Sequence, residues 1–368
     1  MASGDRAADP RLSPNALVAV AQQDYLAAVF DGDRRRAVGE VLALFESGML
    51  PENIINDVLV GAQRAVGRGW QEGRWSVALE HRATAITESA LQTLVDTAMR
   101  SPGVPEEGSA GRAVVACSEG EWHVLPGLMA AGVLRLRGAD VSFIGPSVPA
   151  HELAVFLGAD PPSAVAVTCA MPMSLFGSWR TISALREVGM TVVCGGRGFG
   201  AHGRWVAPIG GDVWAPSFTI GADLLLAAID GARPESRQPG GIPAAAVEVR
   251  RINRDHPAIV ESSLALAVEQ WPHLTSEDRL INTAREDLDE TLRAVTSAAL
   301  ISDTALISEY VRWFESARAP RDVPVAFLAS AFDLLLQTLP PQAHWTRAMV
   351  KAGRADCRLP ALPASWQG

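Results

Sequence analysis

The chain is poor in several residue types, and each shortage excludes a class of protein. Its four cysteines lie far apart in 368 residues without CxxC spacing, so neither a disulfide framework nor a zinc site is predicted. Lys351 is the only lysine, and arginine therefore carries nearly all the positive charge. No apolar run approaches the roughly 20 residues that a membrane span needs, which excludes a helical membrane protein.

Charge and composition narrow the class further. The net charge is −9 and the pI is near 5.3, and the basic residues form no long stripe, so nucleic acid is not expected as a direct partner. Residues 1–14 hold no apolar core followed by a small-residue cleavage site, and a cytoplasmic location is expected. With 48% hydrophobic and 20% charged residues, the chain reads as an ordinary globular protein of two or three units.

Two linkers rich in proline, glycine and charge, 101–111 and 231–243, divide the chain into three units. We expect them at residues 12–102, 111–232 and 245–345, followed by a loosely ordered tail from Gly353. The first unit has the periodicity of a four-helix bundle, with helices near 15–30, 35–45, 51–68 and 76–100. The third also reads as helical, over 259–271, 277–300, 304–317 and 324–339.

The middle unit alternates short apolar runs with helical stretches. Strands are predicted at 113–117, 141–144, 164–169, 191–194 and 213–215, with helices starting near Leu125, Ala150, Leu175, Phe199 and Ile220. This pattern predicts a flavodoxin-like, doubly wound parallel sheet, so the fold class is α/β plus all-α. Ligands of such sheets bind outside the carboxyl ends of the strands, which directs attention to the loops after Cys117, Cys169 and Cys194.

The first of these loops contains a histidine. It runs from Ser118 to Gly127 and places His123 just before a helix, two residues after Glu121. A neutral imidazole there can ligate a transition metal while Glu121 accepts the other ring N–H and fixes the tautomer. Taken alone, the plainer alternative, a helix-capping or exposed histidine, is the better interpretation of so short a motif.

Two further loops favour the interpretation of His123 as a metal ligand. Thr168 ends the third strand, and its hydroxyl can bond a buried heterocycle. Gly195 and Gly196 follow the fourth strand, and glycines let the backbone approach a bulky ligand. Other residues of these loops complete the candidate set: Trp122, Met171, Gly198 and Ser217.

With these residues the segment from about Arg112 to Asp230 resembles the cobalamin-binding domain of corrinoid proteins, in which a loop histidine displaces the cofactor's own base from cobalt. The resemblance implies that His123 is the lower axial ligand and that Thr168, Gly195 and Gly196 line the channel for the displaced nucleotide tail. Methyl-transferring members have Asp where Glu121 stands and one residue fewer between the histidine and the glycine, here Gly127. That departure disfavours a methyl-carrier role.

The first unit resembles the helical cap of light-responsive, adenosylcobalamin-dependent repressors. Trp70, followed ten and eleven residues later by Glu80 and His81, matches their tryptophan-spacer-glutamate-histidine signature. The resemblance implies that Trp70 packs on the adenosyl group and that Glu80 hydrogen-bonds it. Gln71 stands where those repressors carry the histidine that captures cobalt after illumination. The alternative is a tryptophan between helices and a solvated Glu-His pair.

The order of cap, cobalamin domain and helical bundle resembles the photocobilins, which append a globin-like domain that holds biliverdin. A linear tetrapyrrole needs an apolar slot and cations for its propionates. The residue types suited to this are Trp271, His273, Arg285, Tyr310, Arg312 and Trp313. The alternative is that these aromatics form a bundle core or a dimer interface. Cys357 is the one cysteine in this region, so a thioether-linked bilin is not expected.

The sequence therefore predicts a light sensor rather than an enzyme. It would bind adenosylcobalamin and biliverdin, and illumination would change domain placement or oligomeric state, acting on a further copy or a protein partner. The leading alternative is a corrinoid methyl carrier that partners methyltransferases. A subunit of a radical mutase and an interaction protein with a vestigial site are weaker alternatives, since no barrel-sized segment is present for substrate chemistry.

Overall fold

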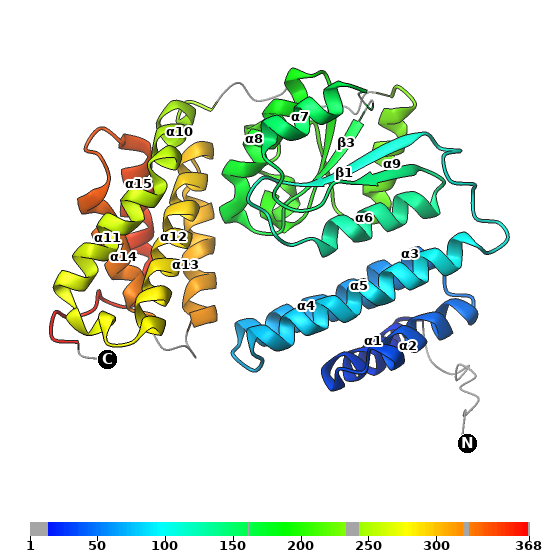
Figure 1. Ribbon diagram of the computed structural model, residues 1–368, viewed down its shortest axis with the longest axis horizontal. Helices are drawn as coiled ribbons and strands as arrows, with labels where there is room; N and C mark the ends of the chain where they lie inside the picture. The colour runs from blue at the N-terminus through cyan, green and yellow to red at the C-terminus, as the bar shows by residue number, and fades with distance from the viewer. Residues whose placement is uncertain (1–13, 161, 163, 233–242, 319–323, 367–368) are drawn as a thin grey trace.

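The computed structural model describes residues 14–366 except 161, 163, 233–242 and 319–323, and its elements fall into three parts (Figure 1). Over these residues the first part, which we call the cap, is a four-helix bundle. Its helices are α1 (Pro14–Asp31), α2 (Arg34–Glu46), the continuous run of α3 (Pro51–Asn53), a π-helical stretch (Ile54–Leu59) and α4 (Val60–Gln71), and α5 (Val77–Met99). Ser76 caps α5 by accepting a hydrogen bond from the Leu79 amide. The predicted bundle is confirmed.

The second part contains a parallel sheet that has five strands in the described residues. The strands are β1 (Arg112–Cys117), β2 (Asp140–Phe143), β3 (Ala164–Thr168), β4 (Thr191–Gly195) and β5 (Val213–Ala215). Their spatial order is β2-β1-β3-β4-β5, with every neighbouring pair parallel. This is the flavodoxin-like order, in which β1 and β3 flank the point where the direction of winding reverses. The predicted fold class is confirmed, and the loops after β1 and β3 lie together at that point.

Helices cover both faces of this sheet. They are α6 (Leu125–Leu136), α7 (Ala150–Gly158), α8 (Leu175–Glu187), preceded by a 3₁₀ turn (Pro172–Ser174), and α9 (Phe218–Ile229). The helix expected from Phe199 is wrong: short 3₁₀ turns at 197–199, 201–203 and 207–209 stand there instead. Gly200 and Gly203 have φ of +77° and +65°, which an α-helix does not allow.

Alternate residues of β1 belong to two different hydrophobic cores. Ala113 and Val115 join the core shared with the cap, α6 and α9. Val114 and Ala116 face the opposite side and join the core that continues into the C-terminal bundle. Because both faces are covered, the central strands β1 and β3 are almost continuously apolar rather than alternating.

The third part, the C-terminal bundle, is entirely helical in its described residues. It comprises α10 (Ala246–Arg254), α11 (His256–Gln270), a 3₁₀ turn (Pro272–Thr275), α12 (Asp278–Ile301), α13 (Thr304–Arg318), α14 (Phe327–Thr338) and α15 (His344–Asp356). The expected end at 345 is therefore too early. The expected loose tail is also wrong, because Leu362 is buried and Trp271 Nε1 donates to the Pro363 carbonyl at 2.9 Å. None of the helices described is long and apolar enough to cross a membrane.

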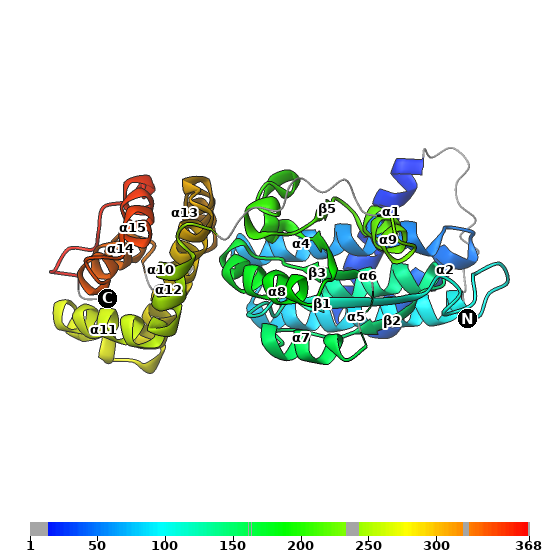
Figure 2. The same ribbon diagram turned by 90° about the horizontal axis from the view of Figure 1, so that it is seen from above.

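The three parts contact one another (Figures 1 and 2). The cap lies against α6, where Gly132 leaves room for Val95 of α5, and Arg137 pairs with Glu52 at 2.8 Å. The C-terminal bundle docks beside the carboxyl edge of the sheet, where Ser297 of α12 donates to the Met173 carbonyl at 3.0 Å. The candidate site therefore lies near a junction of all three parts.

Candidate functional site

The loop between β1 and α6 is fixed at the carboxyl edge of the sheet by its first residue. Ser118 is buried, and both its amide and its hydroxyl donate to the carbonyl of Thr168 at the end of β3, at 3.0 and 3.2 Å. The Ser178 hydroxyl of α8 donates in turn to Ser118 Oγ at 2.8 Å. These bonds fix the start of the loop against the end of β3.

Glu121 organises the rest of the loop. Its side chain is buried, and both oxygens are saturated: Oε1 accepts from the His123 amide at 2.9 Å and lies 2.5 Å from His123 Nδ1. Oε2 accepts from the amides of Ala170 and Met171 at 2.8 and 3.1 Å. One carboxylate thus joins the loops after β1 and β3 and orients the imidazole. The predicted pairing of Glu121 with His123 is present in the structure.

Glu121 and His123 shift each other's pKa values. Burial alone would raise the pKa of Glu121, but hydrogen bonds from the His123 ring and from backbone amides lower the pKa overall. The hydrogen bond to Glu121 raises the pKa of His123, against the effect of burial, and the charge of Glu80 acts in the same direction. The Nδ1 proton is therefore held toward Glu121, and in the neutral ring the Nε2 lone pair is free to bind a metal.

His123 offers a single nitrogen ligand to a metal. Within the described ranges no three His, Cys, Asp or Glu side chains gather as a metal cluster. The His123 side chain is 56% exposed, so the ring edge is accessible. A lone imidazole holds a transition metal firmly only when a macrocycle supplies the other ligands, as in haem proteins. The donor set fits a metal carried by a large planar cofactor such as a corrin.

The glycines after β4 divide into two kinds. A Cβ on Gly195 would meet nothing within 4 Å, so this backbone borders open space that a ligand can enter. By contrast, Gly196 has φ +113° and its Cβ would lie 2.2 Å from the Cys169 carbonyl oxygen, and a Cβ on Gly198 would lie 2.4 Å from Cys169 Sγ. Packing of the loop against the end of β3 therefore explains Gly196 and Gly198, whereas Gly195 suits close approach of a cofactor tail.

The remaining loop candidates have distinct surroundings. Thr168 is buried and its hydroxyl lies 3.5 Å from Cys117 Sγ, a weak acceptor. Ser217 caps α9 by accepting from the Ile220 amide at 3.2 Å, which gives it a structural task. Met171 contributes its backbone amide to Glu121. Trp122 is 70% exposed beside His123 and offers an apolar surface at the mouth of the site.

The cap residues lie across from this loop. Glu80 accepts from the Thr84 hydroxyl at 3.1 Å and is near enough to His123 to affect its pKa, so the two side chains share one electrostatic environment. His81 is 76% exposed and lies 3.7 Å from Glu80. The Trp70 ring contacts the Trp313 ring of α13 with centroids 6.3 Å apart. Thus Glu80 lies on the His123 side of the cap, Trp70 packs between α4 and α13 as in the alternative of a tryptophan between helices, and His81 matches the solvated alternative.

The candidates for a bilin site are not brought together. Trp271 is 1% exposed and belongs to the bundle core, and His273 contacts Trp366 with ring centroids 4.1 Å apart. Arg285 pairs with Glu261 on the surface at 2.8 Å, and Arg312 is exposed. Of the set, Tyr310 and Trp313 are adjacent to each other, with ring centroids 6.1 Å apart. The position of Trp271 matches the alternative that these aromatic residues form the core of the bundle.

Sequence reasoning missed several groups that build the site, and for Met171, which it did single out, it missed the role of the backbone amide. The amides of Ala170 and Met171 and the hydroxyls of Ser118 and Ser178 hold Glu121 and its loop. Their contribution is made by the backbone or by serines with no motif, so no sequence signal marks them. Ser316, which accepts from Gln71 Nε2 at 2.5 Å, was missed for the same reason.

Comparison with known proteins identifies the class. Residues 21–94 and residues 111–219 each match a family described as B12 binding domain. These segments are the cap and most of the α/β part, the two parts that meet around His123. These two matches support a cobalamin-type cofactor for this part of the chain.

Particular relatives are distant. The chain is 28% identical to the HTH-type transcriptional repressor CarH of Myxococcus xanthus over 184 residues, which are 49% of this chain and 59% of the repressor. It is 25% identical to the methanol–corrinoid protein of Methanosarcina barkeri (strain Fusaro / DSM 804) over 171 residues, 46% of this chain and 64% of that protein. The matches thus span less than two thirds of either relative.

Among solved structures, the monomethylamine corrinoid protein of Methanosarcina barkeri superposes with a TM-score of 0.48 and 17% identity, over 55% of this chain and 95% of that one. The fold assignment rests on the strand order given above.

Proposed function

We propose that the chain is a light sensor that holds adenosylcobalamin between the cap and the α/β part, and that it is not an enzyme. When bound, adenosylcobalamin supplies a cobalt–carbon bond that light breaks. The observation that carries the proposal is the contact between Trp70 of the cap and Trp313 of the C-terminal bundle. It connects the side chain expected over the upper face of the cofactor with a separate part of the protein.

On the lower side of the cofactor, the role of the protein would be to position the imidazole of His123 and the nucleotide tail. Glu121 fixes the Nδ1 proton and the orientation of His123, so that Nε2 would be the nitrogen that binds cobalt. The open space at Gly195 would receive the nucleotide tail. Because all four hydrogen bonds of Glu121 are made within the protein, this face is preorganised.

On the upper side of the cofactor, the cap would supply the side chains that rearrange after illumination. Glu80 would accept hydrogen bonds from the adenosyl group, and Trp70 would pack against it. Trp70 and Gln71 also contact Trp313 and Ser316 in α13. A change in the packing of Trp70 therefore reaches the C-terminal bundle directly, and packed interfaces respond in discrete steps. Domain placement or assembly with a further copy would be the output.

We extend the proposal to a non-covalently bound biliverdin in the C-terminal bundle. Its support is the three-part layout and the ring pair of Tyr310 and Trp313, of which Trp313 contacts Trp70 of the cap. The experiment is to supply biliverdin to the purified protein. We expect one equivalent to bind with a long-wavelength absorption band, and the absence of saturable binding would remove the bilin from the account.

The light response is tested on protein reconstituted with adenosylcobalamin in the dark. Absorption spectra and solution scattering are recorded before and after green illumination. We expect the spectrum to change and the radius of gyration or oligomeric state to change with it. An unchanged spectrum would contradict the sensor proposal.

Variants separate detection of light from its output. Trp313→Ala should keep the spectral change but lose the change in scattering, because the contact with Trp70 is removed. Trp345→Ala is the matched control, since Trp345 lies on the surface of α15 and is 40% exposed. If Trp313→Ala responds as the wild type does, the route through Trp70 and Trp313 is not the output.

The second candidate function is a corrinoid methyl carrier that partners methyltransferases. The observation in its favour is the similarity to the methanol–corrinoid protein. A carrier should bind methylcobalamin at least as well as the adenosyl form, whereas the sensor should prefer adenosylcobalamin through Trp70 and Glu80. Competition between the two ligands for the protein in the dark decides between them.

A further inference from the structure

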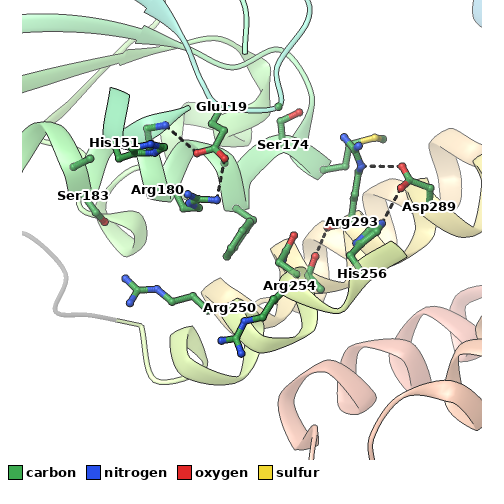
Figure 3. Close-up of a pocket in the computed structure, with 18 of the residues that line it drawn as sticks. Glu119, His151, Ser174, Arg180, Ser183, Arg250, Arg254, His256, Asp289 and Arg293 are labelled. Carbon is green, nitrogen blue, oxygen red and sulfur yellow. Dashed lines mark hydrogen bonds and ion pairs between the residues drawn. The ribbon is translucent and has the colours of Figure 1, made fainter. Parts of the chain in front are cut away.

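A cavity lies between the α/β part and the C-terminal bundle, next to the loop that carries His123. Its volume is about 790 Å³, and its walls come from α7 and α8 on one side and from α10, α11 and α12 on the other (Figure 3). Ligand pockets commonly have volumes of about 300–1,000 Å³ and often lie between domains. The cavity therefore has both the size and the location of a small-molecule site.

The lining is rich in arginine although the protein is acidic. Arg180 pairs with Glu119 at 2.9 Å, and Arg293 pairs with Asp289 at 2.8 Å (Figure 3). Arg250 and Arg254 also line the cavity, and neither has a carboxylate partner among the residues that the structure describes.

These two arginines lie one turn apart on α10, so they present like charges on one face of a short helix. Like charges at this spacing repel each other and destabilise a helix. Glu187 is the remaining carboxylate of the lining, so the cavity keeps an excess of positive charge that a bound anion would offset.

Three helices begin at this cavity. The lining includes His151 in the first turn of α7, Gly177 in the first turn of α8, and Pro257 in the first turn of α11. The amides of Ala150 and Phe176 already donate to Glu119 and to the Ser297 hydroxyl, and Pro257 has no N–H, so these ends offer few free donors. They still contribute the partial positive charge of a helix N-terminus, which together with the arginines makes the cavity attractive to anions.

One arginine is already held in place for recognition. The guanidinium of Arg250 lies over the Trp179 ring, 4.7 Å from its centroid, and this contact uses its face and leaves its N–H edge available. A planar guanidinium held in this way can bind phosphate oxygens through two parallel hydrogen bonds. Met173, Phe176 and Pro257 add apolar surface to the lining, which suits an organic group attached to the phosphate.

From these features we infer that the cavity binds a phosphorylated small molecule of about nucleotide size. The phosphate would lie between Arg250, Arg254 and the helix N-termini, and the organic body would lie on the apolar side of the cavity. Such a ligand would contact both the α/β part and the bundle and would hold them together. The inference does not depend on light sensitivity or on the identity of the upper ligand of cobalt.

The cavity is separate from the cobalamin site but adjoins the same loop. Glu119, which pairs with Arg180 in the cavity wall, lies two residues before Glu121. Glu119 Oε2 also accepts from the Ala150 amide at the start of α7, at 3.1 Å. The test must therefore use protein already saturated with cobalamin, so that a probe cannot enter the channel for the nucleotide tail.

The experiment is calorimetric titration of the cobalamin-loaded full chain with ATP, inorganic phosphate and citrate as probes. We expect ATP to bind saturably with one site per chain, more tightly than inorganic phosphate or citrate, and more weakly as salt is added. The variant pair Arg250→Ala and Arg254→Ala should each lower the affinity for ATP about tenfold or more, the scale of a lost charge-assisted contact. Arg251→Ala is the matched control, because Arg251 is exposed on the same helix and does not line the cavity.

The outcomes are distinct. Saturable binding of ATP that is weakened by Arg250→Ala and Arg254→Ala but not by Arg251→Ala supports the site. Equal affinities in all variants would place the probe elsewhere and overturn it. Tighter binding of citrate than of ATP, equal binding of inorganic phosphate and ATP, or no binding of any probe would overturn the assigned ligand class. Thermal unfolding of each variant without probe shows that a lost affinity is not a lost fold.

Discussion

The loop around His123 and the aromatic residues of the C-terminal bundle differ in how their polar atoms are used. At the loop, every oxygen of Glu121 is bonded, and the bonds aim one imidazole at open space. In the bundle, Trp271 is buried and its N–H donates to the carbonyl of Pro363. This bond holds the C-terminal segment against the bundle and leaves no polar atom of Trp271 for a ligand. Aromatic and basic residues with suitable chemistry thus form a site only where the packing leaves their polar atoms directed outward.

The largest effect that we predict concerns the bundle. Trp271→Ala should lower the free energy of unfolding by about 3–5 kcal/mol, because a fully buried indole is lost and a cavity remains. Urea denaturation of the protein without chromophore measures this, and the exposed Trp345→Ala should stay within about 0.5 kcal/mol of the wild type. Unchanged stability of Trp271→Ala together with lost bilin binding would instead make Trp271 a chromophore contact and erase the contrast.

The second prediction concerns the loop. His123→Ala should weaken cobalamin binding by about 100-fold or more, equivalent to about 2.7 kcal/mol or more, because the side chain that we propose as the ligand to cobalt is removed. Titration followed by absorbance measures the affinity. His344→Ala, on the exposed start of α15, should bind as the wild type does. Equal affinities of the two variants would show that His123 is not the ligand.

Glu121→Gln should have a smaller effect, a loss of about 10- to 100-fold in cobalamin affinity. The amide keeps one acceptor oxygen but turns an NH₂ group toward either the His123 ring or the amides of Ala170 and Met171, which leaves donors facing donors. The same titration applies, with Glu286→Gln on the surface of α12 as control. An affinity for Glu121→Gln equal to that of the control would mean that the carboxylate does not orient the imidazole.

The smallest effect lies at the border of the α/β part and the bundle. Burial alone would raise the pKa of Asp289, but hydrogen bonds from His256 and the charge of Arg293 lower it. A lowered pKa gives stability that is present above the unfolded-state pKa and is lost as the pH falls through the folded-state pKa. The relevant pH is therefore below about 4.

Asp289→Asn should thus cost about 0.2–1 kcal/mol at pH 7, since the carboxylate is partly exposed, and the two proteins should converge in acid. Urea denaturation at pH 7 and at several steps below about pH 4 gives the comparison. A difference between wild type and variant that does not shrink as the pH falls through this range would contradict the assigned cause.

Local patterns predicted most of the fold. The apolar run 164–169 became β3 (Ala164–Thr168), and the amphipathic stretch 277–300 became α12 (Asp278–Ile301), because burial on one or two faces imposes a period that the sequence shows. The errors arose where the signal is not periodic. The loop after β4 is shaped by glycines with positive φ, and α15 lies beyond 324–339, the last helix that the periodicity predicts.

The candidate site likewise has features that the sequence predicts and features that it does not. His123 and Glu121 are two residues apart on one loop, so their pairing is visible in the sequence. The amides of Ala170 and Met171 reach Glu121 only because β3 lies beside β1, and contacts across 49 and 50 residues depend on the order of the strands. Contacts between side chains of different parts, such as Trp70 with Trp313, carry no motif at all.

The central claim is that the nitrogen below cobalt belongs to His123. The most direct measurement is electron paramagnetic resonance of the Co(II) form of the cofactor bound to protein whose histidines carry ¹⁵N, with unlabelled cobalamin. We predict that each cobalt line splits into a doublet, because one ¹⁵N nucleus of the protein is bound. A triplet, the splitting of ¹⁴N, would show that the cofactor keeps its own base and would contradict the account.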